Sequence, residues 1–224
     1  MEALLHPLTL VTFVPLLGAL ILILIPDEQR SLIRWITLIT SLITFVISLF
    51  ILAGFVPGET GLQLQVNVPW FQVGGFTISY FLAVDGLSIL LLLLTTFLTP
   101  ISILSTWTAV EDRVKQFMIF FLLLEMGMIG VFLAQDLFLF YIFWEFSLVP
   151  MYFLIGIWGG PRRIYAAIKF FLYTMAGSIL MLLAILWLGI QGGSFAVPEL
   201  IGLNIPYNIQ FWLFLAFAAA FVIK

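Results

Sequence analysis

The chain contains apolar runs of about 20 residues, one after another, with mostly short polar segments between them. A run of this length crosses the hydrocarbon core of a bilayer as a helix. We expect seven spans: Leu8–Ile25, Ile33–Phe55, Val84–Trp107, Gln116–Leu133, Leu137–Trp158, Ile168–Ile190 and Ile209–Lys224. The seventh is still apolar where the sequence stops, so we expect these 224 residues to be the first part of a longer protein.

The composition excludes a water-soluble domain. Hydrophobic residues make up 64% of the chain and charged residues 8%, whereas soluble domains carry about 25% charged residues. The apolar runs are continuous rather than alternating, which excludes a membrane β-barrel. The predicted fold class is therefore an all-α polytopic transmembrane bundle, with residues 1–224 forming a single membrane domain in the lipid bilayer.

Few residues suit metal or cofactor chemistry. The chain has no cysteine, which excludes disulfides and cysteine-bound iron–sulfur clusters within it. Its one histidine, His6, is too little for a haem or metal site. No basic patch suits nucleic acid. We expect no cofactor, no metal and no nucleic-acid partner.

The basic residues indicate which way the helices cross the membrane. Short loops rich in Lys and Arg stay on the cytoplasmic side. Seven of the basic residues fall in, or just beside, alternate connections between spans: Arg30, Arg34, Arg113, Lys115, Arg162, Arg163 and Lys169. This pattern predicts cytoplasmic loops at these positions and an N-terminus outside.

A long outer loop over residues 56–83 separates the second and third spans. Residues 62–68 alternate polar and apolar, and Gly74-Gly75 precedes a second β-prone stretch over 76–80. This pattern predicts a β-hairpin. A plug over the helix ends is favoured over a binding site.

Glu145 lies in the middle of the fifth span, directly after Trp144. A carboxylate at the bilayer centre costs about 2.5 kcal/mol or more, so such residues usually have a partner or a proton pathway. The alternatives are a proton relay, a permanent ion pair or a neutral acid. Pro150 removes the helical donor to the carbonyl of Phe146, so we expect a kink near Glu145.

Two lysines are candidate partners for Glu145. Lys224 lies about 20 Å along the seventh span, and either meets Glu145 at mid-depth or snorkels to the cytoplasmic face. Lys169 lies near the cytoplasmic end of the sixth span, where snorkelling is also possible. The same span carries a patch of small residues around Gly177 that suits close helix packing.

Three further acids have open roles. Glu125, inside the fourth span, is either a second proton stop or a packed, protonated acid. Asp85 lies at the start of the third span and suits an N-cap. Asp136, in the short outer turn before the fifth span, also suits a cap.

The block FWEFSLVPMYFLIGIWGG over 143–160, preceded by GVFLAQDLFLF, resembles a known family. Supporting stretches are AVDGLS over 83–88, AAIKFFLYTMAGS over 166–178 and AFAAAFVIK over 216–224. Together they are similar to the antiporter-like membrane subunits of respiratory complex I, the subunit M and chain 4 family of NADH–quinone oxidoreductase. The resemblance covers essentially the whole chain.

The resemblance implies a proton-translocating subunit of about fourteen helices built from inverted repeats. It implies a proton-transfer pair of Glu145 and Lys224, with Lys169 following in the route and Asp85 matching a family position. It also implies a hetero-oligomer with other membrane subunits in a bacterial inner membrane, with the redox centres elsewhere. Possible accessory residues are Glu125, Asp85, Asp136, Pro150 and Trp144.

Two rival functions remain open at this point. A subunit of a multi-subunit cation/proton antiporter, or of a membrane-bound hydrogenase, would share the fold and the buried pair. A non-transporting scaffold would use Glu145 and Lys224 only to join helices. The sequence does not decide whether the ion is H⁺ or Na⁺.

Overall fold

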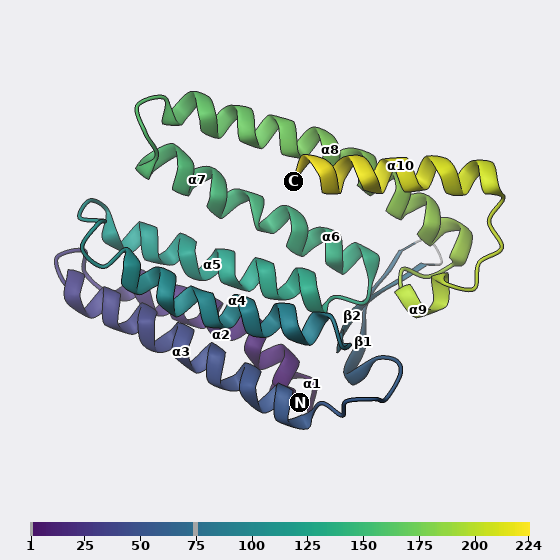
Figure 1. Cartoon of the computed structure of the whole chain (residues 1–224), viewed down its shortest axis with the longest axis horizontal. Helices are drawn as coiled ribbons and strands as arrows, with labels where there is room; N and C mark the ends of the chain where they lie inside the picture. The colour runs from purple at the N-terminus through teal and green to yellow at the C-terminus, as the bar shows by residue number, and fades with distance from the viewer. Residues whose placement is uncertain (1, 74–75) are drawn as a thin grey trace. The chain divides into compact units, whose positions relative to one another are not determined.

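The computed structural model describes residues 2–73 and 76–224 as ten helices and two strands (Figure 1). The helices are α1 Glu2–Leu5, α2 Pro7–Leu24, α3 Arg30–Gly54, α4 Ser88–Ser105, α5 Val114–Leu133, α6 Leu137–Phe146, α7 Leu148–Trp158, α8 Arg163–Gly192, α9 Val197–Leu200 and α10 Tyr207–Ile223. The strands are β1 Gln63–Val73 and β2 Phe76–Val84.

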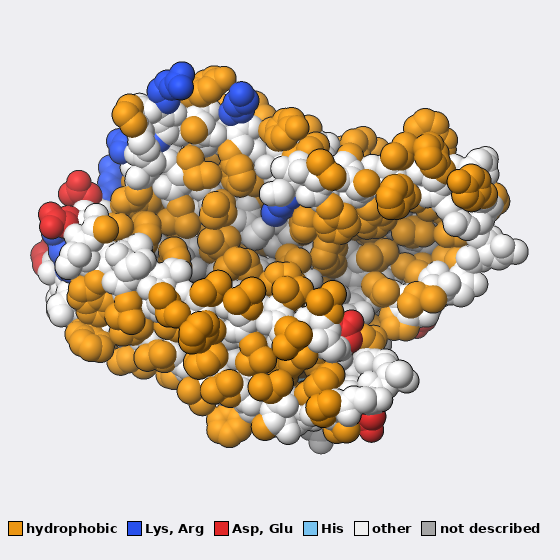
Figure 2. All heavy atoms as spheres, viewed as in Figure 1, with side chains coloured by type: hydrophobic (Ala, Val, Ile, Leu, Met, Phe, Trp, Pro, Cys, Tyr) orange, Lys and Arg blue, Asp and Glu red, His pale blue; other side chains and the backbone are white. Residues whose placement is uncertain are grey.

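Among the described residues, six helical segments are long and apolar enough to cross a membrane: α2, α3, α4, α5, α6 with α7, and α8. The α10 helix is apolar but shorter, at 17 residues. Hydrophobic side chains cover most of the visible face in Figure 2, as a lipid-facing surface requires. The predicted fold class is confirmed, and the chain is an integral membrane protein.

Two predicted span boundaries were wrong. The third span does not begin at Val84, because β2 continues to that residue and α4 begins at Ser88. The sixth begins at Arg163 rather than Ile168, so Lys169 lies within the second turn of α8. Hydropathy alone places both boundaries poorly, since Val84 is as apolar as the helix it precedes and Arg163 is charged.

The β-hairpin predicted for the outer loop is present as a two-stranded sheet of β1 and β2. Both strands are longer than the alternating stretches that predicted them. The expected turn at Gly74-Gly75 lies outside the described residues.

The chain divides into two compact units: Met1–Val66 with Leu82–Leu133, and Asn67–Phe81 with Ala134–Lys224. In the first unit α2, α3, α4 and α5 pack around buried hydroxyl side chains. The Ser48 and Thr96 hydroxyls join α3 to α4 at 2.8 Å. At Gly18 of α2 a side chain would meet Thr40 of α3 at 2.5 Å, so only glycine permits this approach.

In the second unit α8 and α10 approach closely at Gly177. A Cβ at this position would lie 2.9 Å from Ile223 and 3.4 Å from the backbone of Ala220, both on α10. The small residue at 177 therefore lets α10 lie against α8, as the sequence pattern predicted. This contact holds the end of α10 within reach of α6.

Asp136 joins three segments of the second unit. Its Oδ1 accepts hydrogen bonds from the N–H groups of Phe138 and Leu139 at the start of α6, at 2.9 and 3.0 Å. Its Oδ2 accepts from the N–H of Ser79 in β2 at 2.9 Å. The residue is fully buried, and its backbone pairs with Ala196. Burial raises the pKa of Asp136, and the three N–H donors oppose that rise.

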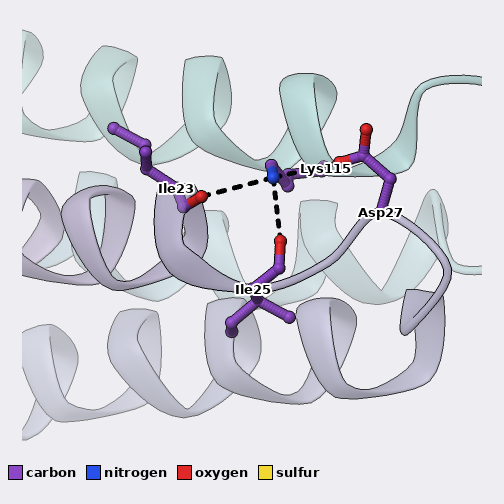
Figure 3. A network of polar contacts seen from close by, with 4 residues as sticks. All are labelled: Ile23, Ile25, Asp27 and Lys115. Atoms are coloured by element: carbon purple, nitrogen blue, oxygen red, sulfur yellow. Dashed lines mark hydrogen bonds and ion pairs between the residues drawn. The ribbon is translucent and has the colours of Figure 1, made fainter.

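Lys115 performs a comparable task in the first unit (Figure 3). Its ammonium donates to the carbonyls of Ile23 and Ile25, at 3.3 and 2.8 Å, where α2 ends. It also forms an ion pair with Asp27 at 3.1 Å. The last carbonyls of a helix have no partner within it and carry partial negative charge, so a cation is favourable there.

We expect Asp136→Asn to destabilise the fold by about 1–3 kcal/mol although it keeps the shape of the side chain. The amide can still accept from the start of α6, but its NH₂ group would face the N–H of Ser79, donor against donor. The measurement is the midpoint of thermal unfolding of the purified protein in detergent micelles. Glu59→Gln, at an exposed acid, is the control. Equal midpoints for the two variants would contradict the three-segment role.

We expect Lys115→Met to lower stability by about 1 kcal/mol, because the end of α2 loses its cation while the apolar stem remains. Arg30→Met removes an exposed cation at the start of α3 and serves as the matched control. The same unfolding measurement applies. A loss no greater than that of the control would show that the contacts in Figure 3 contribute nothing measurable.

Candidate functional site

The fifth span breaks at Ser147, between α6 and α7. The N–H of Ser147 still donates to the carbonyl of Phe143 at 3.0 Å, but the regular ladder does not continue through the junction. Pro150 has no N–H for the carbonyl four residues before it, and its ring crowds that turn. The helix is therefore interrupted close to the position where the sequence predicts a kink, and the interruption leaves backbone carbonyls without helical partners inside the span.

The amine of Lys224 lies at this break. Its Nζ donates to the backbone carbonyl of Trp144 at 2.8 Å and to the hydroxyl of Ser147 at 2.9 Å. It also lies 4.3 Å from the centroid of the Trp144 ring, within the range of a cation–π interaction. The Lys224 residue as a whole is exposed, yet its charged end is held by α6 and the residue after it.

Glu145 follows Trp144 and precedes Ser147 by two residues, so in the sequence it lies between the two residues that hold the amine. One of its carboxylate oxygens, Oε1, is buried and has no hydrogen-bond partner among the described residues. Tyr141 lies one helical turn earlier on α6 and is close enough for its hydroxyl to interact electrostatically with the carboxylate. The carboxylate also attracts the ammonium of Lys224 electrostatically. In the described part of the chain the two charged groups do not approach within 4.0 Å.

Trp144 is fixed from a neighbouring helix. Its indole Nε1–H points at the hydroxyl of Ser178 on α8 at 3.3 Å, and that hydroxyl donates to the carbonyl of Thr174 at 3.0 Å. The ring also makes an edge-to-face contact with Phe221 of α10, at a centroid distance of 5.3 Å. Three helices of the second unit therefore determine where the indole lies.

A hollow of about 660 Å³ leads from the turn between α7 and α8 to Lys224. Arg162 and Arg163 line it at the turn, and Lys169 and Lys224 line it further along. The ammonium of Lys169 lies 5.8 Å from the ring centroid of Tyr165. The structure thus places Lys169 and Lys224 on one hollow, and Lys224 beside Glu145.

Three predicted accessory acids do not contact this group. Asp136 starts α6, about 14 Å along the helix from Glu145 at 1.5 Å per residue. Asp85 belongs to the first unit, where its Oδ1 accepts from the N–H of Ser88 at 2.7 Å and of Leu87 at 3.0 Å. The hydrogen bond from Ser88 holds the pKa of Asp85 below its usual range. Asp85 therefore caps the start of α4.

Glu125 lies on α5 of the first unit, with 0% of its surface exposed. Neither carboxyl oxygen has a hydrogen bond of standard geometry among the described residues. Its polar neighbour is Thr99, whose hydroxyl donates to the carbonyl of Thr95 at 2.9 Å. A hydroxyl has one proton to give, so Thr99 offers Glu125 an acceptor rather than a donor.

Sequence reasoning missed Ser147, Ser178 and Tyr141. A signal existed for Ser147, because a serine three residues after Trp144 and three before Pro150 can bond to a carbonyl of the interrupted turn. Ser178 was noted only as a small residue. Tyr141 is four residues before Glu145, a spacing that places both on one face of α6.

Comparisons with known proteins agree with the sequence resemblance. Residues 134–224 match the family model described as NADH:quinone oxidoreductase/Mrp antiporter, TM. NADH-quinone oxidoreductase subunit M of Rhodobacter capsulatus is 43% identical, over 97% of this chain and 45% of its own length. NADH-ubiquinone oxidoreductase chain 4 of Marchantia polymorpha is 42% identical, over 94% and 42% respectively. The chain spans about half the length of the curated relatives it matches.

Solved structures show the same relationship. A chain of respiratory complex I from Thermus thermophilus superposes with a TM-score of 0.81 at 27% identity, over 96% of this chain and 43% of that one. A chain of the Mrp complex from Dietzia sp. DQ12-45-1b gives a TM-score of 0.74 at 18% identity, over 99% of this chain and 23% of that one. The second similarity shows a shared fold alone.

Proposed function

We propose that this chain, whose residues 134–224 match the NADH:quinone oxidoreductase/Mrp antiporter, TM family model, acts as a proton-translocating membrane subunit of an NADH–quinone oxidoreductase. The observation that carries this proposal is the amine of Lys224 on the broken turn beside Glu145. An acid and an amine from separate helices, both inside apolar segments, form the smallest arrangement that can exchange a proton away from bulk water.

The electrostatic attraction between Glu145 and Lys224 is large enough to change how readily each group holds its proton. Two unit charges about 4 Å apart at an effective dielectric constant of about 20 attract each other by about 4 kcal/mol. A shift of one pKa unit corresponds to about 1.4 kcal/mol. Moving the ammonium toward or away from Glu145 by a few ångströms therefore changes how readily each group holds its proton.

The hollow between the α7–α8 turn and Lys224 supplies the approach. Lys169 lines it between the basic residues of the turn and the amine of Lys224, and we propose that it is the next proton-transfer group of the route. By the positive-inside rule we propose that the turn is cytoplasmic and the N-terminus outside. We further propose that the membrane is a bacterial inner membrane.

The energy for translocation would come from partner subunits. The chain has no cysteine and a single histidine, so the redox centres of the complex would lie in other chains. We propose that this chain works in a hetero-oligomer, embedded in lipid, in which a charge change in a neighbouring subunit moves the balance between Glu145 and Lys224.

A second candidate is a subunit of a cation/proton antiporter, since the matching family model also covers Mrp antiporters. The two functions differ in their driving force. Proton movement driven by NADH oxidation in sealed membrane vesicles supports the first, whereas movement that needs a sodium gradient and no NADH supports the second.

We expect Glu145→Gln to reduce proton pumping about tenfold or more, because the neutral amide cannot take up the proton of the relay, and one pKa unit already corresponds to a factor of ten. The measurement is NADH-driven acidification of vesicles that hold the assembled complex, divided by the rate of NADH oxidation. Glu199→Gln, at an exposed acid of α9, is the control. Pumping by Glu145→Gln at the control level would favour the scaffold alternative.

A further inference from the structure

We propose that Ser147 is a positioning residue for Lys224: its hydroxyl, with the carbonyl and ring of Trp144, forms a seat that holds the ammonium apart from Glu145. This inference rests on the proposed function and deepens it. Ser147 does not itself carry the proton. It determines where the amine resides when it is not paired with the carboxylate.

The hydrogen bonds define the direction of each contact. The Ser147 hydroxyl donates to the carbonyl of Trp144 at 2.8 Å. Its single proton is therefore in use, and the oxygen presents its lone pairs to the ammonium of Lys224 at 2.9 Å. The same carbonyl accepts from Lys224 at 2.8 Å. Amine, hydroxyl and carbonyl thus form a closed triangle of hydrogen bonds.

The seat leaves one donor of the amine unassigned. A lysine ammonium has three N–H donors, and the seat accepts two of them. The indole face of Trp144 adds cation–π attraction at 4.3 Å. The buried Oε1 of Glu145, which has no hydrogen-bond partner among the described residues, is the nearby group that still lacks a donor. The amine therefore has two competing acceptor sets within one helical turn.

The charged groups around the ammonium of Lys224 limit it to these two sets of acceptors. From α6 the titratable group that acts on it is Glu145, which in turn interacts with Tyr141. From α8 Lys169 lines the same hollow, and from the α7–α8 turn Arg162 and Arg163 do. The cations repel the ammonium and the hollow's lining contains no acid, so Glu145 and the seat are the two favourable positions.

The seat is rigid because its parts are fixed by other helices. Trp144 is held by the Ser178 hydroxyl of α8 and by Phe221 of α10. Ser147 is held at the helix break, where its hydroxyl is bonded to the residue three positions earlier. Motion between the two positions is thus confined to the flexible side chain of Lys224.

The test uses two variants of equal shape that differ in the hydroxyl. Ser147→Thr keeps the acceptor and Ser147→Val removes it. We expect pumping per NADH oxidised, in the assembled complex, to stay near the parental level for Thr and to fall at least about threefold for Val and for Ser147→Ala, because a hydrogen bond to a charged group is lost. Equal pumping by the Thr and Val variants would overturn the inference.

A double-mutant cycle separates positioning from simple helix packing. The shift in thermal unfolding midpoint caused by Ser147→Ala is compared between the parent and a Lys224→Met background. If the hydroxyl acts through the amine, the shift should shrink by about half or more in that background. A shift of the same size in both backgrounds would mean that Ser147 only completes the bonding of Trp144, and the inference would fall.

These outcomes are distinct from those of the proposed function. Loss of pumping in Glu145→Gln together with equal pumping by Ser147→Thr and Ser147→Val would support the proposed relay and contradict the role of Ser147. Normal pumping in Glu145→Gln would contradict the proposed relay and therefore also any role of the seat in proton transfer.

Discussion

The hydrogen bond from the amine of Lys224 to the carbonyl of Trp144 is the interaction on which the site depends. An ammonium inside an apolar segment needs acceptors, and an intact helix has none to offer because each carbonyl is already bonded. The break between α6 and α7 changes this locally. Pro150 leaves a backbone carbonyl without its helical donor, and Ser147 adds a hydroxyl. Together they give this stretch of helix uncharged polar groups that can accept hydrogen bonds.

The same break also affects how Lys224 relates to Glu145. The amine does not need a permanent ion pair with the carboxylate, because it is already bonded nearby to neutral dipoles. The carboxylate and the ammonium therefore interact electrostatically while each keeps some freedom. A locked salt bridge would be a poor relay, since breaking one that is buried costs about 3–5 kcal/mol.

Glu125 shows what a buried acid looks like without such a partner. It is fully buried, and its neighbour Thr99 has already given its proton to a backbone carbonyl. An isolated carboxyl in apolar surroundings is most stable as the neutral acid. We find nothing beside Glu125 within the described first unit that would move a proton on, so its geometry favours the packed acid over the second proton stop.

The sequence predicted the helices well because hydropathy over about 20 residues is an intrinsic property of the chain. It also predicted an irregularity near Glu145 from Pro150, whose effect on a helix is local, and the helix is interrupted at Ser147. It could not predict the seat, because Lys224 lies 77 residues from Ser147 and only packing at Gly177 brings α10 close. The start of α4 was missed for a similar reason, since the pairing of β2 with β1 keeps Val84 in a strand.

Lys115 and Lys224 both bind backbone carbonyls, and they differ in how their charge is compensated. Lys115 binds the carbonyls at the end of α2 and also touches a carboxylate, Asp27, whose side chain is 62% exposed. Its charge is neutralised where it lies, so nothing draws the amine elsewhere. Lys224 binds the carbonyl of Trp144 and the hydroxyl of Ser147. Its counter-charge is the carboxylate of Glu145, the residue after Trp144, and this carboxylate lies beyond contact distance. Two hydrogen bonds to neutral groups, without charge compensation, leave the amine with a second favourable position, and the proposed proton relay would require that property.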